Sequence, residues 1–140
     1  MEEAQQIRLE IPSSAEYVSL ARRMVVGIAT RMQFDPVEIS DVKLAVGEAC
    51  NNAVRHGSPS NEHPHVVITC SILPTGLEIE VSNGLPEGKE CQCPDICECL
   101  DFEKEGGMGL FIMKQLMDEV EMKWDQGRAK VRMLKRLRVK

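Results

Sequence analysis

The stretch that decides the fold reads DVKLAVGEACNNAVRHG, from Asp41 to Gly57. Its apolar residues recur every three or four positions, which is typical of one face of an amphipathic helix. The stripe begins just upstream, and its members are Ile39, Val42, Val46, Ala49 and Ala53. Because proline suits the first turn of a helix, the preceding Asp35-Pro36 predicts a helix over residues 36–56.

The segments on either side alternate between strand and helix patterns. An edge strand is predicted over residues 5–11, followed by a helix over 18–32 with Ser13 or Ser14 as its N-cap. The other predicted elements are a hairpin (65–73 and 77–81), a helix (110–120) and two closing strands (120–124 and 128–134). Consecutive antiparallel strands with helices on one face predict a two-layer α+β sandwich.

Composition indicates one ordinary globular domain spanning residues 1–140. Hydrophobic residues make up 43% of the chain and charged residues 28%. No apolar run approaches the roughly 20 residues that span a bilayer, and the N-terminus lacks the apolar core of a signal peptide. We therefore expect a cytoplasmic protein with no membrane partner.

The formal net charge is −5, yet residues 128–140 contain seven basic residues and no acidic one. Basic Arg128, Lys130 and Arg132 alternate with apolar residues, as in a strand with one solvated face. This pattern favours a structural role over a nucleic-acid-binding tail.

Two motifs carry residues suited to phosphate chemistry. Glu48 and Asn52 lie four positions apart on one flank of the predicted helix, where a carboxylate and an amide can hold Mg²⁺. The alternative is a solvated helix flank. The run Gly106–Gly109 (GGMG) precedes an apolar helix whose N-terminus can bind phosphate, or it is simply a loop-to-helix turn.

Together these motifs resemble a known family. DVKLAVGEACNNAVRHG is similar to the N-box of the GHKL (histidine-kinase-like) ATPases, in the variant of the bacterial anti-sigma-factor serine/threonine kinases. GGMGLFIMKQLMDEVE, residues 106–121, is similar to the glycine box of the same family. Their order and separation match, so the resemblance covers nearly the whole chain. It implies a Bergerat-type sandwich with a mixed, mainly antiparallel sheet.

The resemblance also implies roles for single residues. Glu48 matches the general base, and Asn52 matches the Mg²⁺ ligand that bridges to the nucleotide. The glycine-box residues that match the nucleotide-binding positions are Gly107, Met108, Gly109 and Leu110. His56 matches a position often occupied by His, or it is a helix-terminal His that interacts with the dipole.

One position departs from the family pattern. With a one-residue shift, Asn83, followed by Gly84, takes the place of the aspartate that reads the adenine amino group; without the shift that place falls to Ser82. Asn offers a carbonyl acceptor but no charge.

The resemblance implies an ATP- and Mg²⁺-dependent kinase, an anti-sigma factor that sequesters a sigma factor and phosphorylates an anti-anti-sigma antagonist. A homodimer is expected from the same source. The main alternative is an inactive GHKL domain that only binds its partner, and a metal- or redox-sensing regulator is a third hypothesis.

The six cysteines fall into two groups. Cys50 and Cys70 have apolar neighbours and are predicted core residues. The other four, Cys91, Cys93, Cys97 and Cys99, lie within the expected nucleotide lid, residues 84–106. They are either a Zn²⁺ or iron–sulfur site or ordinary reduced thiols in a loop.

Overall fold

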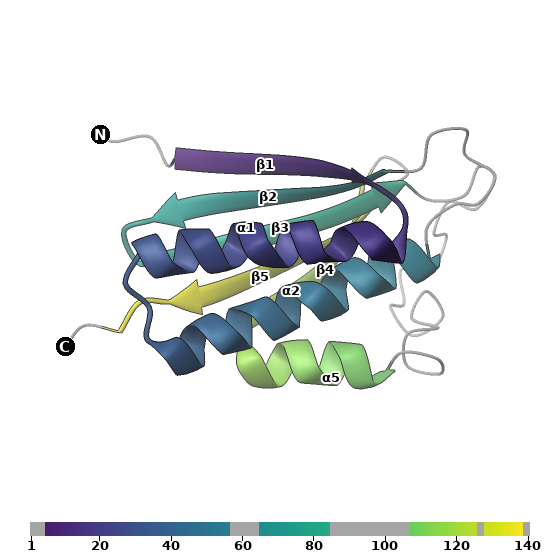
Figure 1. The fold of residues 1–140 in the computed structure, drawn as a ribbon. Coiled ribbons are helices and arrows are strands. Elements are labelled where there is room, and N and C mark those ends of the chain that lie inside the picture. Colours follow the sequence, from purple (N-terminus) through teal and green to yellow (C-terminus); the bar gives the residue numbers. More distant parts are fainter. Residues whose placement is uncertain (1–4, 57–64, 85–106, 126–127, 139–140) are drawn as a thin grey trace.

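The computed structural model describes residues 5–56, 65–84, 107–125 and 128–138, which form a sheet and a layer of helices (Figure 1). The sheet has the strand order β1-β2-β3-β5-β4, and every described pair of neighbours is antiparallel. The strands are β1 (Gln5–Pro12), β2 (His65–Leu73), β3 (Gly76–Gly84), β4 (Glu119–Asp125) and β5 (Arg128–Arg136). The predicted α+β sandwich is confirmed, with antiparallel pairing throughout these strands instead of a mixed sheet.

Among the described residues, three α-helices cover one face of the sheet, and α2 lies between the other two (Figure 1). They are α1 (Val18–Arg31), α2 (Pro36–His56) and α5 (Gly107–Leu116). A 3-10 turn, η1 (Ala15–Tyr17), leads into α1. None of the described helices has the length and apolar character that crossing a bilayer requires.

A reciprocal capping pair starts α2. The backbone N–H of Glu38 donates to Asp35 Oδ1 at 2.8 Å, and the N–H of Asp35 donates to Glu38 Oε1 at 3.0 Å. Two backbone donors at the helix start are thereby satisfied. The cap fixes where the helix begins, and hence which of its residues face the sheet.

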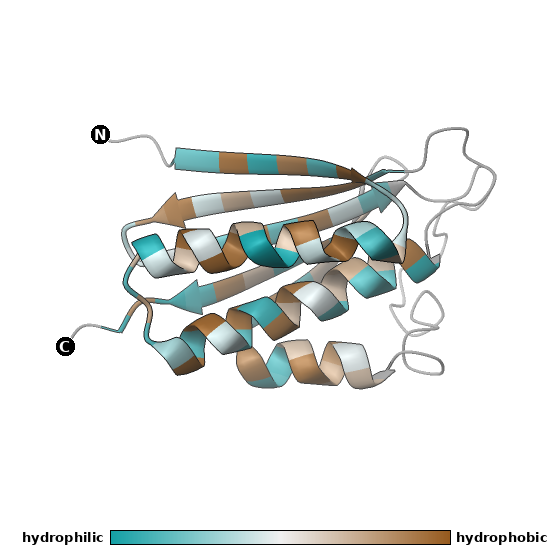
Figure 2. Ribbon diagram, in the orientation of Figure 1, coloured by the Kyte–Doolittle hydropathy of each residue, from teal (hydrophilic) through white to brown (hydrophobic). Residues whose placement is uncertain are grey.

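The core lies between the helices and one face of the sheet. Alternate residues of β3 point to the helices, and Leu77, Ile79 and Val81 among them are almost fully buried. Small residues such as Ala45 and Ala49 on α2 let that helix lie close to the strands. Apolar positions recur along β2, β3 and the helices in Figure 2.

The two described cysteines are confirmed as core residues. Cys50 on α2 and Cys70 on β2 are fully buried. Burial raises the pKa of the Cys50 thiol to about 12, although the nearby Arg22 cation acts in the opposite direction. Burial likewise raises the pKa of Cys70 to about 12. Both thiols therefore stay protonated at neutral pH.

The opposite face of the sheet carries paired charges. Arg132 on β5 lies 3.4 Å from Glu119 on β4 and 3.5 Å from Glu78 on β3. Lys130 lies 3.8 Å from Glu80. The prediction of a strand with one polar face is confirmed, and its cations face carboxylates on the adjacent strands. Such partly exposed pairs contribute at most about 1 kcal/mol each.

The sequence prediction is wrong about the end of α5 and about the cap that starts α1, and β3 runs to Gly84 where a strand to Val81 was predicted. α5 stops at Leu116, where the apolar pattern predicted a helix to Val120. The Asp118 N–H donates to the Leu134 carbonyl at 2.8 Å. The chain after Leu116 therefore forms hydrogen bonds with the sheet instead of continuing the helix. Ser14 precedes η1 and makes no side-chain capping bond, so the predicted Ser cap of α1 is wrong.

Gly27 and Gly76 should respond oppositely to substitution by alanine. A Cβ on Gly27, in the middle of α1, meets nothing within 4 Å, so Gly27→Ala should stabilise the protein by up to about 1 kcal/mol through helix propensity. A Cβ on Gly76 would lie 2.3 Å from the Lys135 carbonyl oxygen, so Gly76→Ala should cost about 1–3 kcal/mol. Urea unfolding of both variants measures the two free energies, and equal effects would contradict the assigned packing.

Candidate functional site

Glu48 and Asn52 lie one turn apart on the flank of α2 that faces α5. The i, i+4 spacing places both side chains on the same side of the helix. Asn52 is 3% exposed and Glu48 is half-buried. The alternative of a solvated helix flank is therefore wrong, because a buried amide and a half-buried carboxylate occupy the junction between two helices.

The glycine box meets this pair at Gly109. A Cβ built on Gly109 would lie 3.1 Å from Glu48 Oε2, 3.1 Å from Asn52 Nδ2 and 3.5 Å from Asn52 Oδ1. The two shorter distances are tighter than ordinary van der Waals contact, so glycine lets the helices approach here without a shift of the Glu48 and Asn52 side chains. Two motifs that are far apart in the sequence are thus brought together.

The chemistry of this junction suits a metal–phosphate group. The first backbone N–H groups of a helix have no partner within it, and its N-terminus carries partial positive charge. In α5 these groups belong to the turn that contains Gly109, beside a carboxylate and an amide oxygen. Oxygen donors of this kind fit Mg²⁺, and helical N–H groups fit phosphate.

Asn83 is the last residue of β3 whose side chain points towards the helices, and it lies beneath α2. Its Nδ2 donates to the Ala53 carbonyl oxygen at 3.2 Å, and the residue is 6% exposed. Ala53 belongs to the last turn of α2, where carbonyls lack helical partners. An ionised aspartate in this place could not donate such a bond. The amide thus links β3 to the end of α2.

Ser82 and Gly84 occupy different positions from Asn83. Neighbouring strand residues point to opposite faces, so Ser82 lies on the side of Glu80, away from α2. Gly84 is the last residue of β3 and pairs with Arg128. Of the two alternatives for the aspartate's place, Asn83 is the one that faces the helices.

The remaining predicted residues are divided between surface and core. Met108 on α5 is 72% exposed, whereas the Leu110 side chain is buried in the core. Because the Leu110 side chain packs in the interior, only its backbone could contact a ligand at this turn. Gly107 is the first residue of α5, and His56 is the last residue of α2. The surroundings of these two residues are outside the description.

The predicted lid lies outside the described residues except for Gly84, and so do its four cysteines, Cys91, Cys93, Cys97 and Cys99. Their metal and thiol alternatives stay as predicted. In the part of the chain that the structure describes, no group of three or more His, Cys, Asp or Glu residues is arranged to hold a metal ion.

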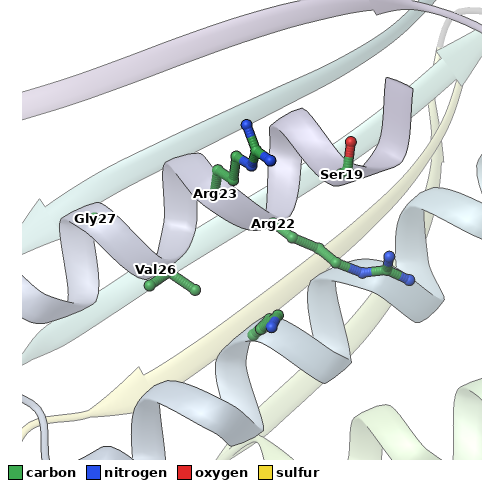
Figure 3. A pocket seen from close by; sticks show the side chains of 6 residues that line it. Ser19, Arg22, Arg23, Val26 and Gly27 are labelled. Carbon is green, nitrogen blue, oxygen red and sulfur yellow. The ribbon is translucent and has the colours of Figure 1, made fainter. Parts of the chain in front are cut away.

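A second feature, a basic groove between α1 and α2, has no counterpart in the sequence analysis. Its lining residues are Ser19, Arg22, Arg23, Val26, Gly27 and Lys43. Figure 3 shows Arg22 reaching from α1 across to α2. A Cβ on Gly47 would lie 2.5 Å from Arg22 Nε, so the guanidinium rests on α2 where a glycine leaves room.

Among the described residues, the three cations of this groove have no carboxylate partner. Within the described residues, Arg22, Arg23 and Lys43 form no salt bridge. In the part of the chain that the structure describes, no acidic residue lines the groove. On a chain of net charge −5 this makes a local positive surface. Sequence reasoning missed it because Lys43 joins the arginines only when α1 and α2 pack together.

Comparison with known proteins adds independent evidence. Residues 11–135 match the family described as the histidine kinase-like ATPase domain. The serine-protein kinase RsbW of Listeria monocytogenes serovar 1/2a is 38% identical over 127 residues, covering 86% of this chain and 81% of the relative. RsbW of Bacillus subtilis strain 168 is 34% identical over 130 residues, covering 89% and 81%.

Solved structures share the fold at lower identity. The RsbU and RsbW domains of a Mycobacterium tuberculosis protein superpose with a TM-score of 0.69 at 15% identity, covering 94% of this chain and 32% of that one. The histidine kinase domain of a blue-light activated kinase from Erythrobacter litoralis gives a TM-score of 0.56 at 19% identity, covering 89% and 60%. At these identities the likeness concerns the fold alone.

Asn83→Asp should destabilise the protein at neutral pH by about 2–3 kcal/mol, since a buried acceptor loses its donor and a carboxylate faces the negative end of α2. Folding disfavours the ionised form of the new carboxyl group. The loss in the free energy of unfolding should therefore be present above the ordinary pKa range of Asp, and it should disappear as a falling pH protonates the carboxyl. Thermal unfolding between pH 4 and 8 measures this.

Asn83→Ala is the matched control for that experiment. It removes the bond without adding charge, so its smaller cost of about 1 kcal/mol should not depend on pH. If the aspartate variant equals the wild-type protein in stability at pH 7, the bond to Ala53 does not hold the end of α2.

Proposed function

We propose, because the chain belongs to the histidine kinase-like ATPase domain family, that it is an ATP-dependent serine/threonine protein kinase and an anti-sigma factor. The observation that carries the proposal is the contact of Gly109 with Glu48 and Asn52, which joins the two halves of a metal–phosphate site. Relatives named serine-protein kinase, at 34–38% identity over most of the chain, support the kinase activity.

Each residue has a defined task in this proposal. Glu48 accepts the proton of the serine or threonine hydroxyl as its oxygen forms a bond to the γ-phosphorus of ATP. The bond between that phosphorus and the β–γ bridging oxygen breaks, and ADP leaves with that oxygen. Asn52 holds Mg²⁺ through its amide oxygen, and the first N–H groups of α5, from Gly107 onward, bind the phosphates. Asn83 Oδ1 accepts a hydrogen bond from the adenine amino group. When held there, Mg²⁺ would supply positive charge beside the phosphates.

The partners proposed are a sigma factor and an anti-anti-sigma antagonist, with a homodimer as the working unit in the cytoplasm. Residues 1–140 act as one domain whose lid spans residues 84–106. The basic groove offers a docking surface for an acidic segment of a protein partner, because Arg22, Arg23 and Lys43 line it and form no salt bridge among the described residues. Metal or redox sensing by the lid cysteines stays a separate hypothesis.

Glu48→Gln should lower phosphate transfer to the antagonist at least 100-fold while changing the Kd for Mg-ATP less than threefold. A general base contributes about 10²–10⁴-fold in the transition state, and the amide keeps the carboxylate's shape. Single-turnover transfer of labelled phosphate and calorimetric titration with Mg-ATP measure the two quantities.

Glu16→Gln, on the exposed η1 turn, is the control and should leave both quantities unchanged. Full transfer by the Glu48 variant would remove Glu48 from the proposed role. Absence of Mg-ATP binding by the wild-type protein at millimolar nucleotide would leave only the partner-binding alternative.

Arg22→Ala should weaken binding of the acidic partner about tenfold or more, since a charge-assisted contact is worth about 1.5–3 kcal/mol. Arg31→Ala, at the exposed end of α1 and outside the groove, is the control. Calorimetry with the antagonist and with the sigma factor, at low and high salt, measures the effect. Equal affinities for the two variants would exclude the groove as a docking surface.

A further inference from the structure

Lys135 is the one basic or acidic side chain among the buried polar residues of the described chain, and it is 6% exposed. It pairs with Leu77 in the β3–β5 ladder, so it points to the helix-facing side of the sheet. Its Nζ lies 3.4 Å from Asp41 Oδ2 on α2 and donates to the Leu116 carbonyl oxygen at the end of α5. One ammonium group thus connects a strand with two helices.

Both partners attract a cation for physical reasons. The Leu116 carbonyl is among the last of α5, where helical acceptors are unpaired and the helix carries partial negative charge. Asp41 supplies a full negative charge from the first half of α2. The ammonium therefore draws the C-terminus of α5 towards the start of α2.

The other end of α5 lies at the candidate site. Figure 1 shows α5 antiparallel to α2, and Gly109 contacts Glu48 and Asn52 two turns or more beyond Asp41. A ten-residue helix is about 15 Å long and behaves as a short rod. A rod held at Leu116 and packed at Gly109 has a defined position along α2.

We propose that Lys135 is a positioning residue that sets the place of the glycine-box turn relative to Glu48 and Asn52, and thereby the affinity for nucleotide. The inference rests on the proposed function for its ligand. Stability alone is a poor explanation of this lysine, because replacing a buried ion pair by apolar groups of similar volume is often neutral or stabilising.

The test compares Lys135→Met with Lys114→Met in the full chain. Both variants remove a lysine near the end of α5, but Lys114 is exposed and forms no salt bridge among the described residues. Lys135→Met should raise the Kd and KM for Mg-ATP about tenfold, with a smaller change in kcat, while Lys114→Met binds like the wild-type protein. Lys135→Arg, which keeps the charge and the donors, should restore part of the affinity.

A second readout needs no nucleotide. Amide hydrogen exchange of the free protein should be faster in α5 of the Lys135→Met variant and unchanged in α1, because Lys135 bonds to α5 and α2 and, among the described residues, not to α1. If α5 protection and the Kd both equal those of the wild-type protein, Lys135 does not position the helix. If α5 exchange becomes faster in the variant but the wild-type protein binds no Mg-ATP, Lys135 does hold α5 and the proposed function is wrong.

Asp41→Asn covers the case in which Lys135→Met does not fold. It removes the negative charge that faces the ammonium and keeps the side-chain size. The Kd for Mg-ATP and α5 exchange should shift in the same direction as for Lys135→Met, by a smaller factor. An unchanged Kd together with unchanged α5 exchange in Asp41→Asn would overturn the proposal.

Discussion

The close approach of α5 to α2 at Gly109 is the contact on which the other features of the site depend. With a side chain at this position, Glu48 Oε2 and Asn52 Nδ2 would each lie 3.1 Å from its Cβ, and these two side chains would have to shift by a few tenths of an ångström. Glycine removes that obstacle and leaves the first turn of α5 beside a carboxylate and an amide. The same close approach puts positive helical N–H groups next to oxygen donors, which is the electrostatic requirement of a metal–phosphate site.

This contact is supported from the sheet. The apolar face of the sheet carries the three helices, and α2 is placed by its capping pair, Asp35 and Glu38, and by its small core residues. Two polar side chains reach out of the same inner face: Asn83 contacts the end of α2, and Lys135 contacts α2 and α5 near their other ends. The sheet therefore holds both helices through specific polar contacts in addition to apolar packing, which by itself is non-directional.

Asn83 shows how a departure from a family pattern can have a structural reason. An aspartate there would face the Ala53 carbonyl with a second acceptor, whereas the amide donates to it. The residue that the resemblance assigns to the nucleotide is thus also a cap for α2. In the proposed kinase, any change at this position alters stability as well as base recognition.

The residue pattern alone determined the layers, the main helix and the polar and apolar faces of the strands. The spacing of Val42, Val46 and Ala49 is set by the helical repeat, and the alternation from Arg128 to Met133 by the strand repeat, so both are local properties. Glu48, Asn52 and Gly109 were singled out from sequence as candidate site residues, by their motifs and by the resemblance to a family.

Only the tertiary structure decided which of these residues meet and which distant charges support them. In the structure Asn83, and not Ser82, faces the helices, because of the pleat of β3, and it bonds to α2. The helix α5 ends early because the Asp118 N–H donates a hydrogen bond to the sheet. The basic groove at Arg22 and the anchor at Lys135 join residues from different elements. Contacts of this kind depend on how helices pack on a sheet, and a local sequence pattern carries no record of that packing.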